Sequence, residues 1–260
     1  MNGNFLGRLS LKDIVAMTEV VSPEIIAEEI VQGGLVHIRN VADGEEAYHY
    51  SSGNWGPMYV TVKGGCSNQN LFKFMARQLS LRVSDITDFD FVAGLVTGGV
   101  PPSIYLRDWV QEMQDREIPW VYIRDTRKLG GTKEHVTGLY MPNGQRSLFI
   151  PEGAVGLVVE ELVNYANSTT NGAILLRSEE CKCGCRRGVT ILDYDNPVAH
   201  KYRAKYNVEL TSVVKMTEVL DAIQRIGLYS DDLVEDARWS QRDPQEWMGF
   251  YGLEKTELKK

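Results

Sequence analysis

The 260-residue chain has few cysteines and no long hydrophobic run. Of its four cysteines, Cys181, Cys183 and Cys185 lie within one five-residue stretch, which is not the distribution of a secreted disulfide framework. No window approaches the roughly 18 uninterrupted apolar residues of a membrane helix, and the first residues lack a cationic start followed by an apolar run. We therefore expect a cytoplasmic protein in a reducing compartment, with no membrane partner.

Positive charge is also scarce. The chain has 28 Lys and Arg residues against 35 Asp and Glu residues, which gives a formal net charge of −7. Proteins bind a nucleic-acid backbone with a basic face that displaces counterions, so this balance disfavours nucleic acid as a partner. A small anionic ligand stays open, because a few local donors can hold it.

The cysteine run gives little support for a metal site. Structural zinc sites space their cysteines by about two to four residues and take a second pair from elsewhere. Here the spacing is one residue, and the only other cysteine is Cys66. The four histidines show neither ligand spacing nor a partner serine or cysteine. Reduced loop cysteines are the main interpretation of the run, and a structural metal is the alternative.

The chain does have the composition of a globular protein. Hydrophobic residues make up 43% and charged residues 24%, enough for one substantial core. No repeat, linker or charge block marks a domain boundary, so we expect a single domain over residues 1–260.

Helix-like and strand-like segments alternate along the chain. An N-cap serine, a proline at the first helical position and apolar residues at helical spacing predict a helix over 22–31. The runs 35–41 and 57–63 predict a small β element. Further on, the patterns predict helices over 71–81, 103–113 and 155–166, and strands over 91–96, 119–125, 146–150 and 173–177. Single helices between strands favour a mainly parallel sheet, with ligands beyond the carboxyl ends of the strands.

Two glycine-containing loops follow predicted strands. Thr97, Gly98 and Gly99 follow strand 91–96, and Glu152 to Gly156 lie between strand 146–150 and helix 155–166. In such loops backbone N–H groups can turn toward an anion, and the next helix adds its dipole. Both loops could hold phosphate. Tight strand-to-helix turns are the alternative, since short glycine motifs have many false positives.

A locally basic segment stands out in this acidic chain. It contains Arg124, Arg127, Lys128, Lys133 and His135, with glycines at 130 and 131. The combination suits a mobile lid that closes over a polyanion and excludes water. A solvated surface loop is the alternative.

In order along the chain, these segments resemble the orotate phosphoribosyltransferases from about residue 22 to residue 247. The stretch YSSGNWGPMYV is similar to the family's N-terminal hood, and DFVAGLVTGGVPP to its diphosphate-binding loop. The stretch WVYIRDTRKLGGTKEHVTG is similar to its mobile catalytic loop. DAIQRIGLYSDDLVEDARWSQRDPQEW closely follows its terminal helices, including Trp239, Asp243-Pro244 and Trp247.

The resemblance implies the α/β fold of type I phosphoribosyltransferases. This fold is a mainly parallel sheet flanked by helices, with hood elements at about 20–65 and C-terminal helices at about 215–250. The implied function is pyrimidine nucleotide synthesis, by transfer of phosphoribosyl from phosphoribosyl diphosphate to orotate or another pyrimidine-like base. The implied cofactor is Mg²⁺. The implied assembly is a homodimer in which the mobile loop reaches the neighbouring site.

The resemblance also implies roles for particular residues. The catalytic residues would be Arg124 and Lys128, which would neutralise the leaving diphosphate. Phosphoribosyl diphosphate would be bound by Thr97, Gly98, Gly99, Glu152, Gly153, Ala154, Val155 and Gly156, and the base by Ser52, Gly53, Tyr59 and Lys63. Metal ligands from protein side chains are not expected.

The sequence departs from the family where the chemistry should lie. Trp55 stands where the family's hood has a lysine, and Gly130 where its mobile loop has a histidine. The family's phosphoribosyl diphosphate signature has two acids and Thr-x-Gly-Gly after a strand, whereas FIPEGAVG offers only Glu152. A second frame, LVVEELVNYANS, supplies Glu160-Glu161. We favour the first frame because 155–166 has helical periodicity and strand 173–177 needs a helix before it.

These departures leave two further hypotheses for the function. One is a non-catalytic nucleotide-binding or interaction protein that keeps the scaffold. The other is a transferase that uses a different base. Fold alone does not separate them from the first.

Overall fold

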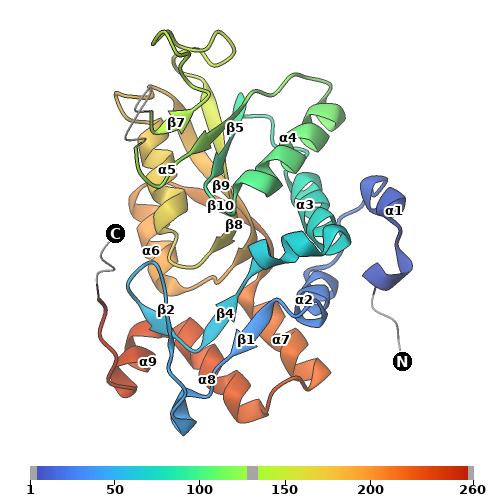
Figure 1. Cartoon of the computed structure of the whole chain (residues 1–260), viewed down its shortest axis with the longest axis vertical. Helices are drawn as coiled ribbons and strands as arrows, with labels where there is room; N and C mark the ends of the chain where they lie inside the picture. Colours follow the sequence, from blue (N-terminus) through green and yellow to red (C-terminus); the bar gives the residue numbers. More distant parts are fainter. Residues whose placement is uncertain (1–4, 128–133, 257–260) are drawn as a thin grey trace.

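The computed structural model describes residues 5–127 and 134–256, and its centre is a six-stranded sheet (Figure 1). The strand order is β10-β9-β8-β5-β6-β7, and every neighbouring pair is parallel except β6 with β7. The strands are β5 Phe91–Leu95, β6 Trp120–Ile123, β7 Val136–Thr137, β8 Val155–Val163, β9 Gly184–Asp193 and β10 Glu209–Lys215. The predicted mixed α/β fold with a mainly parallel sheet is confirmed.

Helices cover both faces of the sheet, and side chains of β5 and β8 alternate between the two. Val92, Leu157 and Val159 join the apolar cluster that includes residues of α2, α3, α4 and α7. Val158 joins the other cluster, with α5. The helices are α1 Leu11–Val15, α2 Pro23–Gln32, α3 Gln69–Val83, α4 Val100–Gln114, α5 Asn167–Leu176, α6 Pro197–Lys205, α7 Met216–Ile226, α8 Asp231–Arg242 and α9 Pro244–Phe250.

The hood predicted for about 20–65 is built from α2 and two small antiparallel pairs. Strand β1 (Val36–Ile38) pairs with β4 (Met58–Val60), and β2 (Tyr48–His49) pairs with β3 (Trp55–Gly56). Short 3-10 turns η1 (Leu6–Arg8), η2 (Val41–Asp43) and η3 (Val62–Ser67) complete this half. The blue hood strands and the orange and red C-terminal helices lie together below the sheet in Figure 1.

The last helix, α9, packs against the hood. Trp247 and Met248 of α9 are buried with Ala47, and Trp55 packs against this cluster. The family-like tail therefore has a packing role, because its tryptophan anchors the C-terminal helices to the hood. None of the helices in the described part of the chain has the length and apolar character of a membrane span.

Three predicted elements in the middle of the chain are wrong. Residues 146–150 form no strand, residues 155–163 form strand β8 where a helix was predicted, and 173–177 lie in and just after helix α5. A central parallel strand is covered on both faces and reads as an unbroken apolar run, which helical spacing can match by chance. The pair Asn171-Gly172, of a kind that often ends a helix, lies inside α5.

The segment before β8 is an irregular loop tied down by one arginine. Arg146 donates from Nε to the Ile150 carbonyl at 2.6 Å and from Nη1 to the Cys181 carbonyl at 2.7 Å. Its Nη2 donates to the Pro151 carbonyl at 3.2 Å and lies 3.0 Å from Cys183 Sγ. The guanidinium thus joins this loop to the cysteine run, whose three side chains are all buried.

We expect Arg146→Ala to lower the free energy of unfolding by about 2 to 3 kcal/mol, because several hydrogen bonds to partly buried carbonyls are lost together. Arg225→Ala is the matched control. Its ion pair with Glu28 joins two side chains that are 46% and 40% exposed, so the loss should stay below about 1 kcal/mol. Urea unfolding measures both. Equal effects would show that Arg146 does not anchor the loop.

Candidate functional site

Two loops meet at the carboxyl edge of the sheet. Thr97–Gly99 follow β5, and Asn164–Ala166 follow β8. Because β5 and β8 are parallel neighbours, with Gly94 opposite Val159, their carboxyl ends lie at the same edge. The first loop lies where the sequence predicted it. The second loop was not predicted, because the sequence patterns favoured Glu152 to Gly156 as the other phosphate-binding loop.

The loop after β5 fits closely against β8. A Cβ atom at Gly99 would lie 2.9 Å from the Leu95 nitrogen and would overlap the Val159 carbonyl oxygen. A Cβ atom at Gly98 would overlap the carboxylate of Glu161. Both glycines are buried, whereas Thr97 is exposed. The loop therefore brings its backbone to within contact of an acidic side chain.

Glu161 is the centre of a charged cluster. Burial raises the pKa of Glu161, nearby Asp125 raises it further, and Lys63 lowers it. Burial also raises the pKa of the Cys66 thiol, and the Glu161 charge adds to that shift. Lys63 and Cys66 both belong to η3, and Asp125 follows β6. The carboxylates of Glu161 and Asp125 could accept hydrogen bonds from hydroxyl groups, and the Lys63 ammonium could pair with an anion.

The loop after β8 leads directly into helix α5. Ala166 has φ 58°, a left-handed conformation that favours glycine, and no side chain caps the first turn of the helix. Asn196, which lies between β9 and α6, donates from Nδ2 to the Asn164 carbonyl at 2.6 Å and so holds the loop in place. Uncapped N–H groups and the helix dipole can bind a phosphate at this point.

Residues Glu152 to Gly156 lie at the opposite edge. Val155 begins β8, and Gly156 pairs with Phe91, the first residue of β5. Glu152 is exposed and forms an ion pair with Lys182 at 3.3 Å, and Gly153 donates to the Lys182 carbonyl. The assignment of Glu152, Gly153, Ala154, Val155 and Gly156 to phosphate binding assumed a loop leaving a strand. That assumption is wrong, because the segment enters one.

The basic segment after β6 is only partly described. Arg124 donates from Nη2 to the Tyr122 hydroxyl at 2.8 Å and from Nε to Thr137 Oγ1 at 3.1 Å. Arg127 forms an ion pair with Glu180. Lys128, Gly130, Gly131 and Lys133 lie outside the described residues.

The residues predicted to bind a base are not brought into one cluster. Gly53, with φ 81°, lies in the turn between β2 and β3, and its carbonyl accepts from Thr256 N at 3.0 Å. Ser52 accepts from Asn54 in the same turn. Tyr59 is 41% exposed on β4, beside Tyr48. Lys63 lies near Glu161, as described above.

Trp55 of β3 contacts the segment that follows α9. The Trp55 ring stacks on His49 with centroids 4.0 Å apart, and its Nε1 donates to the Glu254 carbonyl at 3.0 Å. Thr256 Oγ1 lies 2.9 Å from His49 Nε2. Trp55 and His49 thus hold the segment that follows α9 against the hood.

Three tyrosines fill the space between the hood and the sheet. The Tyr50 ring lies 6.4 Å from the rings of both Tyr165 and Tyr194, which follow β8 and β9. Tyr50 also donates to the Met58 carbonyl at 2.5 Å. A cavity of only about 10 Å³ is left among these residues, room for about one water molecule.

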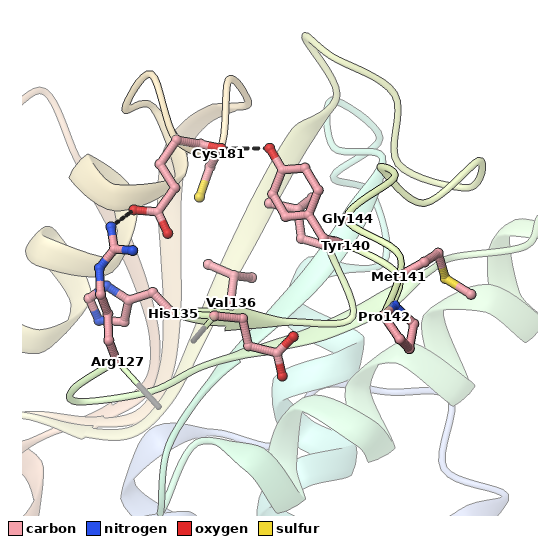
Figure 2. A pocket seen from close by; sticks show the side chains of 11 residues that line it. Arg127, His135, Val136, Tyr140, Met141, Pro142, Gly144 and Cys181 are labelled. Atoms are coloured by element: carbon pink, nitrogen blue, oxygen red, sulfur yellow. Dashed lines mark hydrogen bonds and ion pairs between the residues drawn. The ribbon is translucent and has the colours of Figure 1, made fainter. Parts of the chain in front are cut away.

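Larger hollows lie away from this edge. One of about 240 Å³ is lined by residues such as Arg127, His135, Tyr140, Met141 and Cys181 beside β7 (Figure 2). The Tyr140 hydroxyl donates to the Glu180 carbonyl at 2.6 Å, a hydrogen bond drawn as a dashed line in Figure 2. Another, of about 700 Å³, is an open groove between α1 and α4. The strand-end loops line neither hollow.

Comparison with known proteins agrees with the fold. No family model matches the chain. An orotate phosphoribosyltransferase of Coxiella burnetii is 23% identical over 215 residues, covering 78% of this chain and 88% of that relative. One of Rhizobium meliloti is 23% identical over 239 residues, covering 90% and 93%. The solved structure of the orotate phosphoribosyltransferase from Aeropyrum pernix has a TM-score of 0.56 at 19% identity, covering 78% of this chain and 99% of that one.

The fold is therefore that of the type I phosphoribosyltransferases. In sequence the chain is similar to proteins named orotate phosphoribosyltransferase, as its segments predicted. The signal that could have located the second loop was present in the sequence: Glu160-Glu161 follow an apolar run and precede Asn164 to Ser168.

Proposed function

We propose that the chain transfers phosphoribosyl from phosphoribosyl diphosphate to orotate or a related base, in pyrimidine nucleotide synthesis. The observation that carries the proposal is that two loops, Thr97–Gly99 and Asn164–Ala166, follow neighbouring parallel strands at one edge of the sheet, with Glu161 against the first loop. The names of the sequence relatives support the same reaction. By the same resemblance we propose a cytoplasmic homodimer.

Each loop has one part in this proposal. Thr97 and Gly98 donate backbone hydrogen bonds to the diphosphate. The N–H of Gly99 already donates to the Leu95 carbonyl at 2.9 Å, so Gly99 serves the loop by its close approach to β8. The start of α5 holds the 5′-phosphate. The Glu161 carboxylate accepts from the ribose hydroxyls. Arg124 and Lys128 neutralise the leaving diphosphate, so that catalysis is mainly electrostatic and needs no covalent nucleophile. Ser52, Gly53, Tyr59 and Lys63 stay the proposed base contacts.

The implied Mg²⁺ fits a site in which the substrate supplies most ligands. Among residues 5–127 and 134–256, no group of three or more His, Cys, Asp or Glu side chains could hold a metal ion. We propose that the oxygen atoms of the diphosphate and ribose bind the ion. Its chemistry there is to offset charge on the leaving group.

A second candidate function is favoured by the tyrosines under the hood. The cavity of about 10 Å³ beside Tyr50, Tyr165 and Tyr194 is far too small for a pyrimidine base. A protein that binds a phosphoribosyl ligand without transferring it to a base needs no such space.

One experiment separates these functions. The full-length protein is titrated with phosphoribosyl diphosphate and Mg²⁺ in a calorimeter, orotate is added, and released diphosphate is assayed. Orotate-dependent release supports the transferase. Saturable heat without release in the presence of orotate, uracil or other pyrimidine bases supports the binder. No heat at millimolar ligand would contradict both.

A further inference from the structure

The two acids of β8 lie inside the strand. Glu160 pairs with Thr190 of β9, and the ladder continues to Val163 opposite Asp193. Successive side chains of a strand point to opposite faces. Glu160 therefore shares a face with Val158, and Glu161 shares the other with Val159.

Glu161 faces the β5 loop. Its carboxylate occupies the position that a Gly98 side chain would take. Its face is that of the apolar cluster containing Val159 and residues of α3 and α4. Lys63 and Cys66 both lie in η3. The Lys63 charge lowers the pKa of Glu161, and the Glu161 charge raises the pKa of the Cys66 thiol.

Glu160 faces helix α5. The hydroxyl of Thr169, in the first turn of that helix, donates to the Glu160 carboxyl group, and Ser168 interacts with the same group. Thr169 itself has no solvent exposure. This contact joins the middle of β8 to the turn that follows Asn164–Ala166.

We infer that the acid pair is divided: Glu161 alone meets the ligand, and Glu160 is a positioning residue that holds the first turn of α5 against β8. The ligand part rests on the proposed function. The positioning part rests on the Glu160–Thr169 contact and the strand geometry.

The charges around Glu160 favour its neutral form. Burial raises the pKa of Glu160 to about 8, the Thr169 hydrogen bond lowers it, and the charges of Glu161 and Asp125 raise it. The charged side chains named here, Glu161 and Asp125, are both acidic, and Ser168 and Thr169 are neutral. A neutral carboxyl group can still accept the hydrogen bond from the Thr169 hydroxyl, and it needs no cation beside it.

The folded-state pKa lies above the unfolded value, which fixes the sign of the pH dependence. Because folding raises the pKa of Glu160, protonation of this group stabilises the folded state over the unfolded state. That stabilisation is complete below about pH 4.5 and is lost as pH rises through about 8. Glutamine resembles the neutral acid and does not titrate. Glu160→Gln should therefore remove this part of the pH dependence.

The test uses Glu160→Gln, Glu160→Ala and Glu161→Gln in the full-length protein. We expect the melting temperature of Glu160→Gln to match wild type near pH 5 and to exceed it by at least about 3 °C at pH 9. Its affinity for phosphoribosyl diphosphate with Mg²⁺ should stay within about threefold of wild type, while Glu160→Ala loses about tenfold. Thr169→Val should resemble Glu160→Ala, and Thr169→Ser should restore affinity.

Two results would overturn the inference. One is a melting-temperature difference between Glu160→Gln and wild type that does not change with pH. The other is a folded Glu160→Gln that loses as much affinity as Glu161→Gln. If wild type binds no phosphoribosyl diphosphate, the proposed function fails, and the melting curves still decide whether Glu160 positions α5 as a neutral acid.

Discussion

Glu161→Gln is expected to weaken binding of phosphoribosyl diphosphate by about 10- to 100-fold. A hydrogen bond to a charged group contributes about 1.5 to 3 kcal/mol, and the amide replaces one acceptor oxygen of the carboxylate by a donor. The variant should fold, because the group it replaces lies beside Gly98 and the change keeps its size. Calorimetric titration in the presence of Mg²⁺ measures the change.

Glu152→Gln is the control for this variant. Glu152 carries the single acid of the frame favoured from sequence, but its exposed side chain pairs only with Lys182 in the described structure. We expect its affinity to equal that of wild type. A loss of affinity in Glu152→Gln together with none in Glu161→Gln would place the ligand at the other edge of the sheet.

Gly99→Ala is expected to lower the free energy of unfolding by about 3 kcal/mol or more. The new Cβ would meet the Val159 carbonyl oxygen and the Leu95 nitrogen and oxygen, which are backbone atoms of the two central strands and cannot yield cheaply. Gly99 has φ −75°, so the effect is steric and does not come from a left-handed backbone. Urea unfolding followed by circular dichroism measures it.

Gly249→Ala provides the matched control for the added methyl group. Gly249 is exposed in helix α9, and a Cβ there would meet nothing within 4 Å. Alanine in a helix interior is favoured over glycine by about 0.5 to 1 kcal/mol, so a small stabilisation is expected. Equal stability of the two variants would mean that the β5 loop does not lie against β8 as described.

Local signals in the sequence predict α2 and β5 well. Ser22 and Pro23 mark the start of α2, and the run FVAGLV followed by two glycines marks β5 and its loop. In these segments, capping chemistry and a change from apolar strand to glycine turn agree with each other. Agreement between independent local signals makes such predictions dependable.

The centre of the sheet is harder to predict because burial removes the alternation that identifies a strand. Leu157, Val158 and Val159 are all buried, so this part of β8 lacks the alternation of apolar and polar residues that identifies a strand. Its two glutamates occupy the partly exposed end and imitate the polar face of a helix. Helix α5 adds to the error, since its last residues, AILL, form an apolar run typical of a strand.

The candidate site could be predicted only in part for the same reason. Thr97–Gly99 were found because a regular strand precedes them. The loop after β8 is not predicted, because the helical spacing of 155–166 hides the strand before it, although Glu160-Glu161 supply an acid pair. The phosphoribosyl diphosphate signature proposed here is therefore shifted to 157–168, where Ala166 takes a left-handed conformation that favours glycine. The tyrosine contacts depend on long-range packing that no local pattern encodes.

The most direct test of the account is amide hydrogen exchange with and without phosphoribosyl diphosphate and Mg²⁺, followed by mass spectrometry of overlapping peptides. We predict slower exchange at residues 97–98 and 167–169, whose N–H groups would bind the phosphates, and no change at 152–156. Protection at 152–156 without protection at the other two segments would contradict it.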